Sequence, residues 1–158
     1  MSPSPPLSTL DEKVQRLLDR YPQPRSAAMP ILHLIQETYG FISSEAMEWT
    51  ATRLGLQPAQ ILELVTFYPM FRQKPVGRNH VKVCRTLSCA LEGAEPLRDY
   101  LLRKLGAKLG ETTADGRFTV SEVECLACCG TAPVMMVNDD LHEGVTPEKA
   151  DQILAACP

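Results

Sequence analysis

The chain has 158 residues, of which 44% are hydrophobic and 22% are charged, an ordinary composition for one soluble domain or two small ones. Its formal net charge of −3 gives no general attraction to nucleic acid or to an anionic membrane. No apolar run approaches the roughly 20 residues of a membrane-spanning helix, so no direct membrane insertion is expected. The first residues form neither a secretory signal nor a transit peptide, which predicts a cytoplasmic protein, most simply a bacterial one.

The N-terminal half carries four segments with helical periodicity. Thr9 and Glu12 fit a capping box that begins the first helix, and Pro22 ends it. Three further helices are expected over residues 26–39, 43–55 and 57–67. Residues 1–8 are rich in Pro and Ser and are expected to fray. We therefore predict a helical N-terminal domain, a four-helix bundle, over residues 1–75.

After Phe71 the pattern changes to short alternating strands. A polar connector leads into a predicted strand over residues 80–84, and a predicted helix over 95–105 separates it from a second strand over 118–123. Two short strands and a closing helix follow, over residues 134–137, 141–143 and 146–155. This βαβ unit, hairpin and closing helix have the order of a thioredoxin-like domain. The predicted fold class is α+β, with the second domain over residues 76–158.

Four cysteines stand in two close pairs. Cys84 and Cys89 lie in C-R-T-L-S-C, and Cys125 and Cys129 lie in C-L-A-C-C-G. Thiols stay reduced in a cytoplasmic protein, so close pairs indicate metal binding or redox chemistry more than disulfides. Each pair follows a predicted strand, where two loops can converge. Four thiolates in tetrahedral geometry suit an iron–sulfur cluster or a zinc ion.

The spacing leaves several interpretations open. Structural zinc sites most often use C-x2-C loops, whereas these pairs have four and three intervening residues, which favours a larger two-iron cluster. Cys125 and Cys128 also form a literal C-x-x-C, typical of thioredoxin-like redox enzymes. Buried, inert thiols are the plainest interpretation and suit Cys157 and Cys128. Spacing alone does not decide whether Cys128 or Cys129 belongs to the second pair.

Two other features have competing interpretations. The corner at Gly55 joins two helices as a DNA-binding helix-turn-helix does, but the second helix, from Pro58 to Phe67, carries no Lys or Arg for phosphate contacts. We therefore expect no nucleic-acid partner. The apolar residues from Val65 to Phe71 could form core or a partner-facing patch. The sequence has no G-x-G-x-x-G motif and no Ser/His/Asp or paired-carboxylate pattern, so no catalytic residue is predicted.

Two cysteine motifs, V-C-R-T-L-S-C-A-L-E-G-A and V-E-C-L-A-C-C-G-T-A-P-V-M-M-V-N-D, join three N-terminal motifs, I-x-x-x-Y-G-F-I-S, L-G-L-x-P-A-Q-I and V-T-F-Y-P-M-F. Together they resemble the NuoE family, the thioredoxin-like [2Fe-2S] subunits of NADH:quinone oxidoreductase (complex I), over nearly the whole chain. The family's second pair reads C-L-G-A-C-G. The resemblance therefore implies four cluster ligands, with Cys128 at the family's usual Ala: Cys84, Cys89, Cys125 and Cys129.

The resemblance implies one [2Fe-2S] cluster that exchanges electrons with FMN on a partner subunit. That partner would be a flavoprotein that binds NADH and FMN and carries its own [4Fe-4S] cluster. Both subunits would belong to the peripheral arm of complex I, associated with the bacterial inner membrane through the complex. The same module occurs in NAD-linked hydrogenases and formate dehydrogenases. An alternative of a different class is a zinc-stabilised DNA-binding or scaffolding protein.

Overall fold

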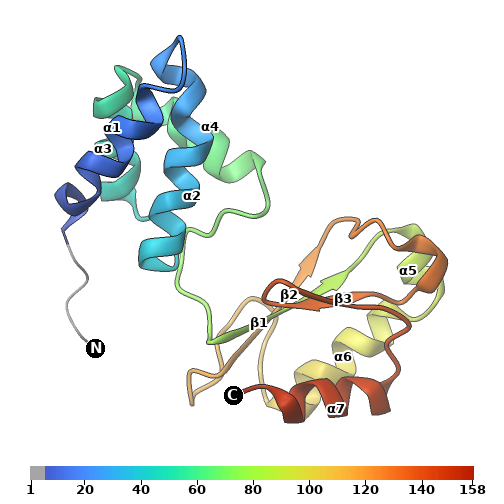
Figure 1. Cartoon of the computed structure of the whole chain (residues 1–158). Coiled ribbons are helices and arrows are strands. Elements are labelled where there is room, and N and C mark those ends of the chain that lie inside the picture. Colours follow the sequence, from blue (N-terminus) through green and yellow to red (C-terminus); the bar gives the residue numbers. More distant parts are fainter. Residues whose placement is uncertain (1–5) are drawn as a thin grey trace. The chain divides into compact units, whose positions relative to one another are not determined.

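The computed structural model describes residues 6–158 and divides the chain into two compact units, Met1–Pro75 and Val76–Pro158 (Figure 1). The architecture is mixed helix and sheet. Most of the fraying expected at residues 1–8 falls on residues 1–5, which lie outside the described part. Leu7–Leu10 instead form a 3-10 helix. In the described chain, no helix is long and apolar enough to cross a membrane.

In the described part of the first unit, all regular secondary structure is helical. Two 3-10 helices and four α-helices follow each other: η1 (Leu7–Leu10), α1 (Asp11–Leu18), η2 (Pro24–Ala27), α2 (Ala28–Tyr39), α3 (Ser44–Leu54) and α4 (Pro58–Phe67). Their apolar stripes meet in one buried cluster, in which Ile31, Ile35 and Ile61 are fully buried. Burial of this kind stabilises short helices that would be marginal in isolation.

The start and end of α3 follow capping chemistry, whereas the start of α1 does not. The Ser43 side chain accepts a hydrogen bond from Ala46 N at the start of α3, and Gly55 ends α3 with a φ of 65°. The capping box expected at Thr9 is wrong, because its hydroxyl donates to the Pro6 carbonyl at 2.8 Å. The preceding 3-10 helix already turns the backbone, so α1 lacks an extended first residue whose side chain could reach back to it.

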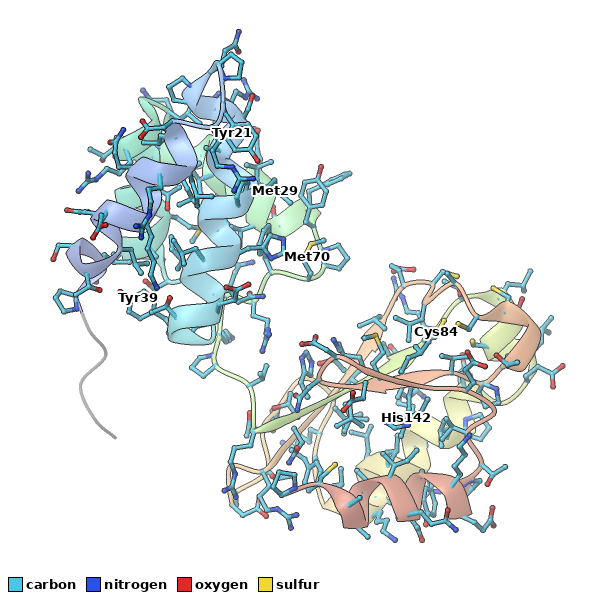
Figure 2. All side chains as sticks on the ribbon, in the orientation of Figure 1. Tyr21, Met29, Tyr39, Met70, Cys84 and His142 are labelled. Carbon is cyan, nitrogen blue, oxygen red and sulfur yellow. The ribbon has the colours of Figure 1, made fainter. Side chains whose placement is uncertain are left out.

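The apolar segment at the end of α4 divides between core and surface. Val65 and Phe71 are buried, with exposed fractions of 2% and 7%, whereas Phe67 and Met70 are 77% and 48% exposed. Figure 2 shows Met70 in the segment that follows α4. The Val65–Phe71 segment is therefore neither wholly core nor wholly a surface patch.

The second unit is built on a four-stranded sheet within residues 79–142. Its elements are β1 (Asn79–Cys84), α5 (Leu87–Leu91), α6 (Ala94–Leu105), β2 (Phe118–Val123), η3 (Cys129–Thr131), β3 (Met135–Val137), β4 (Asp140–His142) and α7 (Pro147–Ala156). The strand order is β2-β1-β3-β4. The β1 and β2 strands are parallel, and β3 and β4 form an antiparallel hairpin on the other side of β1. The predicted βαβ unit and hairpin are both present. In Figure 1, α6 and α7 lie on the same side of the sheet.

One short helix is not evident from the sequence. The five-residue α5 lies directly after β1 and contains Cys89. A helix this short has too few residues to display a helical period, so Thr86 before it could not by itself indicate a helix start. The predicted loop between the first two cysteines therefore contains a turn of helix.

At Gly77 the backbone of the connector lies close against the backbone at the start of β2. A Cβ at this position would lie 2.8 Å from the backbone nitrogen of Phe118 and 2.9 Å from the carbonyl carbon of Arg117. The Gly77 N–H donates to Thr119 Oγ1 at 2.8 Å, which fixes this approach. We predict that Gly77→Ala lowers the free energy of unfolding by about 1–3 kcal/mol, measured by chemical denaturation of the full chain. Gln73→Ala, an exposed change in the same connector, is the control, and equal unfolding midpoints for the two variants would contradict the prediction.

Candidate metal centre

The two cysteine loops leave the sheet at one edge. In the parallel pair of β1 and β2, Cys84 is directly opposite Val123, and both strands end there. Parallel strands that end in register deliver their following segments to the same side of the sheet. Arg85 N donates to the Val123 carbonyl at 3.0 Å, and Cys84 N donates to the Val134 carbonyl at 3.1 Å. The first bond joins the starts of the two loops, and the second joins the start of the first loop to the end of the second. Figure 2 shows Cys84 at this end of the sheet.

The second pair has the spacing of two ligands of one metal. The Sγ atoms of Cys125 and Cys129 are 3.7 Å apart, and both residues are exposed. Two thiolates on one tetrahedral metal with metal–sulfur bonds of about 2.3 Å lie about 3.8 Å apart. The 3-10 helix that begins at Cys129 brings its thiol back toward the loop. This pair could therefore hold a tetrahedral ion with little rearrangement.

The first pair is buried. Cys84 and Cys89 are each 2% exposed. Cys84 ends β1, and Cys89 lies on the buried side of α5. The first cysteine pair is therefore buried and the second pair is exposed, so the four thiols span from the core of the unit to its surface. Within residues 6–158, all six cysteines are free thiols.

A hydrogen-bonding group faces one sulfur in each loop. Ala127 N donates to Cys125 Sγ at 3.3 Å, and Thr86 Oγ1 lies 3.2 Å from Cys84 Sγ. Ala127 has a φ of 63°, a left-handed conformation that costs a non-glycine residue roughly 1–2 kcal/mol. The loop thus adopts a left-handed turn at a residue other than glycine.

The same hydrogen bonds set the acidity of the thiols. Burial raises the pKa of Cys84, but hydrogen bonding with Thr86, Leu126 and Cys89 together outweighs it, so the net pKa is lowered. The backbone of Ala127, followed by the Cys129 thiol and the Thr86 hydroxyl, lowers the pKa of Cys125. Burial, with the neighbouring Cys84, raises the pKa of Cys89. Thiolates are the species that bind metals, so the donors around Cys84 and Cys125 favour the metal-binding form.

Cys128 differs from its neighbours. It is half-buried and packs against the hydrophobic core of the second unit. Burial, followed by a hydrogen bond with Glu143, raises the pKa of its thiol. The structure therefore places the Cys129 thiol beside Cys125 and packs Cys128 against the core. Sequence spacing could not separate these two cysteines. Cys157 lies just after α7 and packs on the same core.

The arrangement of donors can be compared with the group they would hold. Among residues 6–158, no three His, Cys, Asp or Glu side chains are grouped around a point that suits a single metal ion. The cysteines lie instead as one pair per loop, Cys84 with Cys89 and Cys125 with Cys129. Four thiols in two pairs fit the donor set of a [2Fe-2S] cluster, which takes four cysteine thiolates.

The surface beside the thiols is apolar. Leu87 and Leu91 lie one turn apart on α5 and are 75% and 77% exposed, while Cys89 faces the interior between them.

Arg85 Nε donates to Glu124 Oε1 at 3.0 Å, so the first residues of the two loops are also joined by an ion pair. Neither the exposed leucines nor this ion pair stands out in the sequence, because their significance depends on the unpredicted helix and on the meeting of the loops.

Comparisons with known proteins agree with this geometry. Residues 14–158 match the family described as thioredoxin-like [2Fe-2S] ferredoxin. An NADH-quinone oxidoreductase subunit of Rhizobium meliloti is 42% identical over 146 residues, which are 92% of this chain and 87% of that protein. The NADH-quinone oxidoreductase subunit 2 of Thermus thermophilus is 44% identical over 132 residues, which are 83% of this chain and 73% of that protein.

A solved structure shares the fold. The crystal structure of an NAD+-reducing [NiFe]-hydrogenase in the air-oxidized state superposes with a TM-score of 0.66 at 21% identity. The superposition covers 79% of this chain and 22% of the hydrogenase chain, so this chain corresponds to a small part of that protein. The match over residues 14–158, together with relatives above 40% identity over most of their length, identifies the chain as a member of the thioredoxin-like [2Fe-2S] ferredoxin family.

Proposed function

We propose that the chain is an electron-transfer subunit that holds one [2Fe-2S] cluster, with Cys84 and Cys89 on one iron and Cys125 and Cys129 on the other. The observation that carries this proposal is the meeting of the two loops at one sheet edge, with the Cys125 and Cys129 sulfurs 3.7 Å apart. When bound, such a cluster accepts and releases one electron. The chain's own residues hold the thiols, supply hydrogen bonds to them and bury one pair.

The two sides of the site would serve different purposes. The buried Cys84 and Cys89 join the site to the core of the unit, and this limits rearrangement when the charge of the site changes. The exposed Cys125 and Cys129 leave the other side open to an electron donor or acceptor. Electron transfer weakens steeply with distance, so a partner's redox group must approach this exposed side.

The partner would be the flavoprotein subunit of an NADH:quinone oxidoreductase. The relatives named above are subunits of NADH-quinone oxidoreductase, which supports membership of such a complex. The flavoprotein would bind NADH and FMN and carry a [4Fe-4S] cluster, and the cluster of this chain would exchange electrons with the flavin. The assembly would lie on the cytoplasmic side of the bacterial inner membrane. The hydrogenase structure favours an NAD-linked hydrogenase as the second candidate complex.

The two units would act as two domains, residues 1–75 and 76–158. Each has its own buried cluster of apolar residues, which supports independent folding. The shared core of α1–α4 supports a four-helix bundle for the first domain. We further propose that the partner docks over α5, because Leu87 and Leu91 offer an exposed apolar surface on the helix that carries Cys89.

The cluster itself gives the first test. Anaerobically purified protein should be red-brown, contain two irons and two sulfides per chain and give an EPR signal when reduced, since a reduced [2Fe-2S] cluster holds one unpaired electron. Metal analysis, absorption and EPR measure this. A colourless protein that contains one zinc per chain would refute the proposal.

The two adjacent cysteines give a matched pair of variants. Cys128→Ala should retain the cluster, because Cys128 packs on the core of the unit. Cys129→Ala should lose most of the cluster, because it removes one of the two sulfurs that lie 3.7 Å apart. Iron content and visible absorption after identical preparation are the measurements. The reverse order of cluster content would assign the fourth ligand to Cys128.

The docking surface can be tested with a charge on α5. Leu91→Asp should weaken assembly with the co-expressed flavoprotein by about tenfold or more, since burying an unpaired charge in an interface is costly. Leu109→Asp, a change at another exposed leucine in the same unit, is the control. Both variants should keep their cluster spectrum. Equal affinities of the two variants, measured by titration of the purified subunits, would place the interface elsewhere.

A further inference from the structure

Thr86 occupies a capping position but is not used as a cap. It immediately precedes α5, and its extended backbone, with φ −76° and ψ 166°, suits a helix N-cap. A threonine there normally accepts a hydrogen bond from the backbone of the first turn. Within the described chain, no side-chain hydrogen bond caps α5. The hydroxyl is therefore free to take another partner.

The partner of the hydroxyl is sulfur. Thr86 Oγ1 lies 3.2 Å from Cys84 Sγ, within hydrogen-bond distance. Cys84 is one of the two buried thiols, so this half-buried hydroxyl lies directly beside a proposed cluster ligand. A metal-bound thiolate carries no proton, so in that state the hydroxyl must be the donor.

We propose that Thr86 is a positioning residue that donates its hydroxyl hydrogen to the sulfur of Cys84 and thereby raises the reduction potential of the bound cluster. This inference rests on the proposed function. Hydrogen bonds to cluster sulfurs are among the determinants of potential. Reduction adds negative charge to the cluster and its thiolates, and a donor to those sulfurs stabilises the more negative state more strongly. Thr86 would act through the Cys84 sulfur, which its hydroxyl contacts at 3.2 Å.

The threonine can be replaced without a large change of shape. Thr86→Val keeps the β-branched shape and removes the hydroxyl, and Thr86→Ser keeps the hydroxyl and removes the methyl group. We expect Thr86→Val to bind its cluster and to shift the midpoint potential to a more negative value. Thr86→Ser should restore the potential toward that of the original chain. A redox titration of each purified, cluster-containing protein, followed by EPR, measures this.

Thr131 supplies a matched control in the second loop. Its hydroxyl donates to the Cys128 carbonyl at 3.2 Å rather than to a sulfur. Thr131→Val therefore removes a hydroxyl from the same region without removing a donor to sulfur. Its midpoint potential should equal that of the unmodified chain. A shift in Thr131→Val as large as that in Thr86→Val would show a general loop effect and would overturn the role given to Thr86.

The outcomes separate this inference from the proposed function. Cluster absorption and iron content report whether the four cysteines bind iron, whereas the midpoint potential reports the action of Thr86. A loaded Thr86→Val protein with an unchanged potential would overturn the inference and leave the proposed function intact. If Thr86→Val and Thr86→Ala both fold but bind no cluster while Thr86→Ser does, the hydroxyl is required to hold the cluster, and the tuning role is overturned.

Discussion

The site depends on the parallel pairing of β1 with β2. Because these two strands end opposite each other at Cys84 and Val123, the two cysteine loops begin at neighbouring points although 35 residues of intervening sequence lie between Cys89 and Cys125. A parallel pair needs a crossover, and α6 supplies it. The apolar residues of β1 and β2 and the α6 face that covers them therefore stabilise the metal centre as much as the fold.

Hydrogen bonds to the sulfur atoms then stabilise the cysteine loops that the sheet brings together. Thr86 Oγ1 lies 3.2 Å from Cys84 Sγ, and Ala127 N donates to Cys125 Sγ at 3.3 Å. Each donor stabilises the thiolate form of the cysteine that it contacts. Ala127 keeps a left-handed φ at a cost of roughly 1–2 kcal/mol and in that conformation donates to Cys125. A strained residue that is retained beside the thiols is consistent with a site in which hydrogen-bond geometry matters.

Part of this could be predicted from sequence. The βαβ unit, the hairpin and the later strands follow from alternation and turn residues, which are local signals. The position of α5 could not be predicted, because five residues show no period. The distinction between Phe67 and Phe71 depends on how the chain turns after α4, since an apolar residue gives the same signal whether it faces the core or the solvent. The cap expected at Thr9 is absent because a 3-10 helix already precedes α1.

The site residues, too, were only partly predictable from the sequence. Two cysteine pairs after two strands predict a four-thiol site, but spacing treats Cys128 and Cys129 alike. Only the folded loop shows that one thiol faces Cys125 and the other packs on the core. The role of Thr86 is equally hidden in the sequence, since a threonine before a short helix is typical of a cap. Three-dimensional hydrogen bonding, rather than residue type, distinguishes the two uses.

The central claim is that each cysteine pair holds its own iron. Anomalous diffraction at the iron absorption edge, from crystals of the cluster-containing protein, tests this most directly because it locates iron atoms independently of the protein density. The account predicts two iron positions, one bonded to Cys84 and Cys89 and the other to Cys125 and Cys129. A single metal position bonded to all four sulfurs, or an iron bonded to Cys128 in place of Cys129, would contradict it.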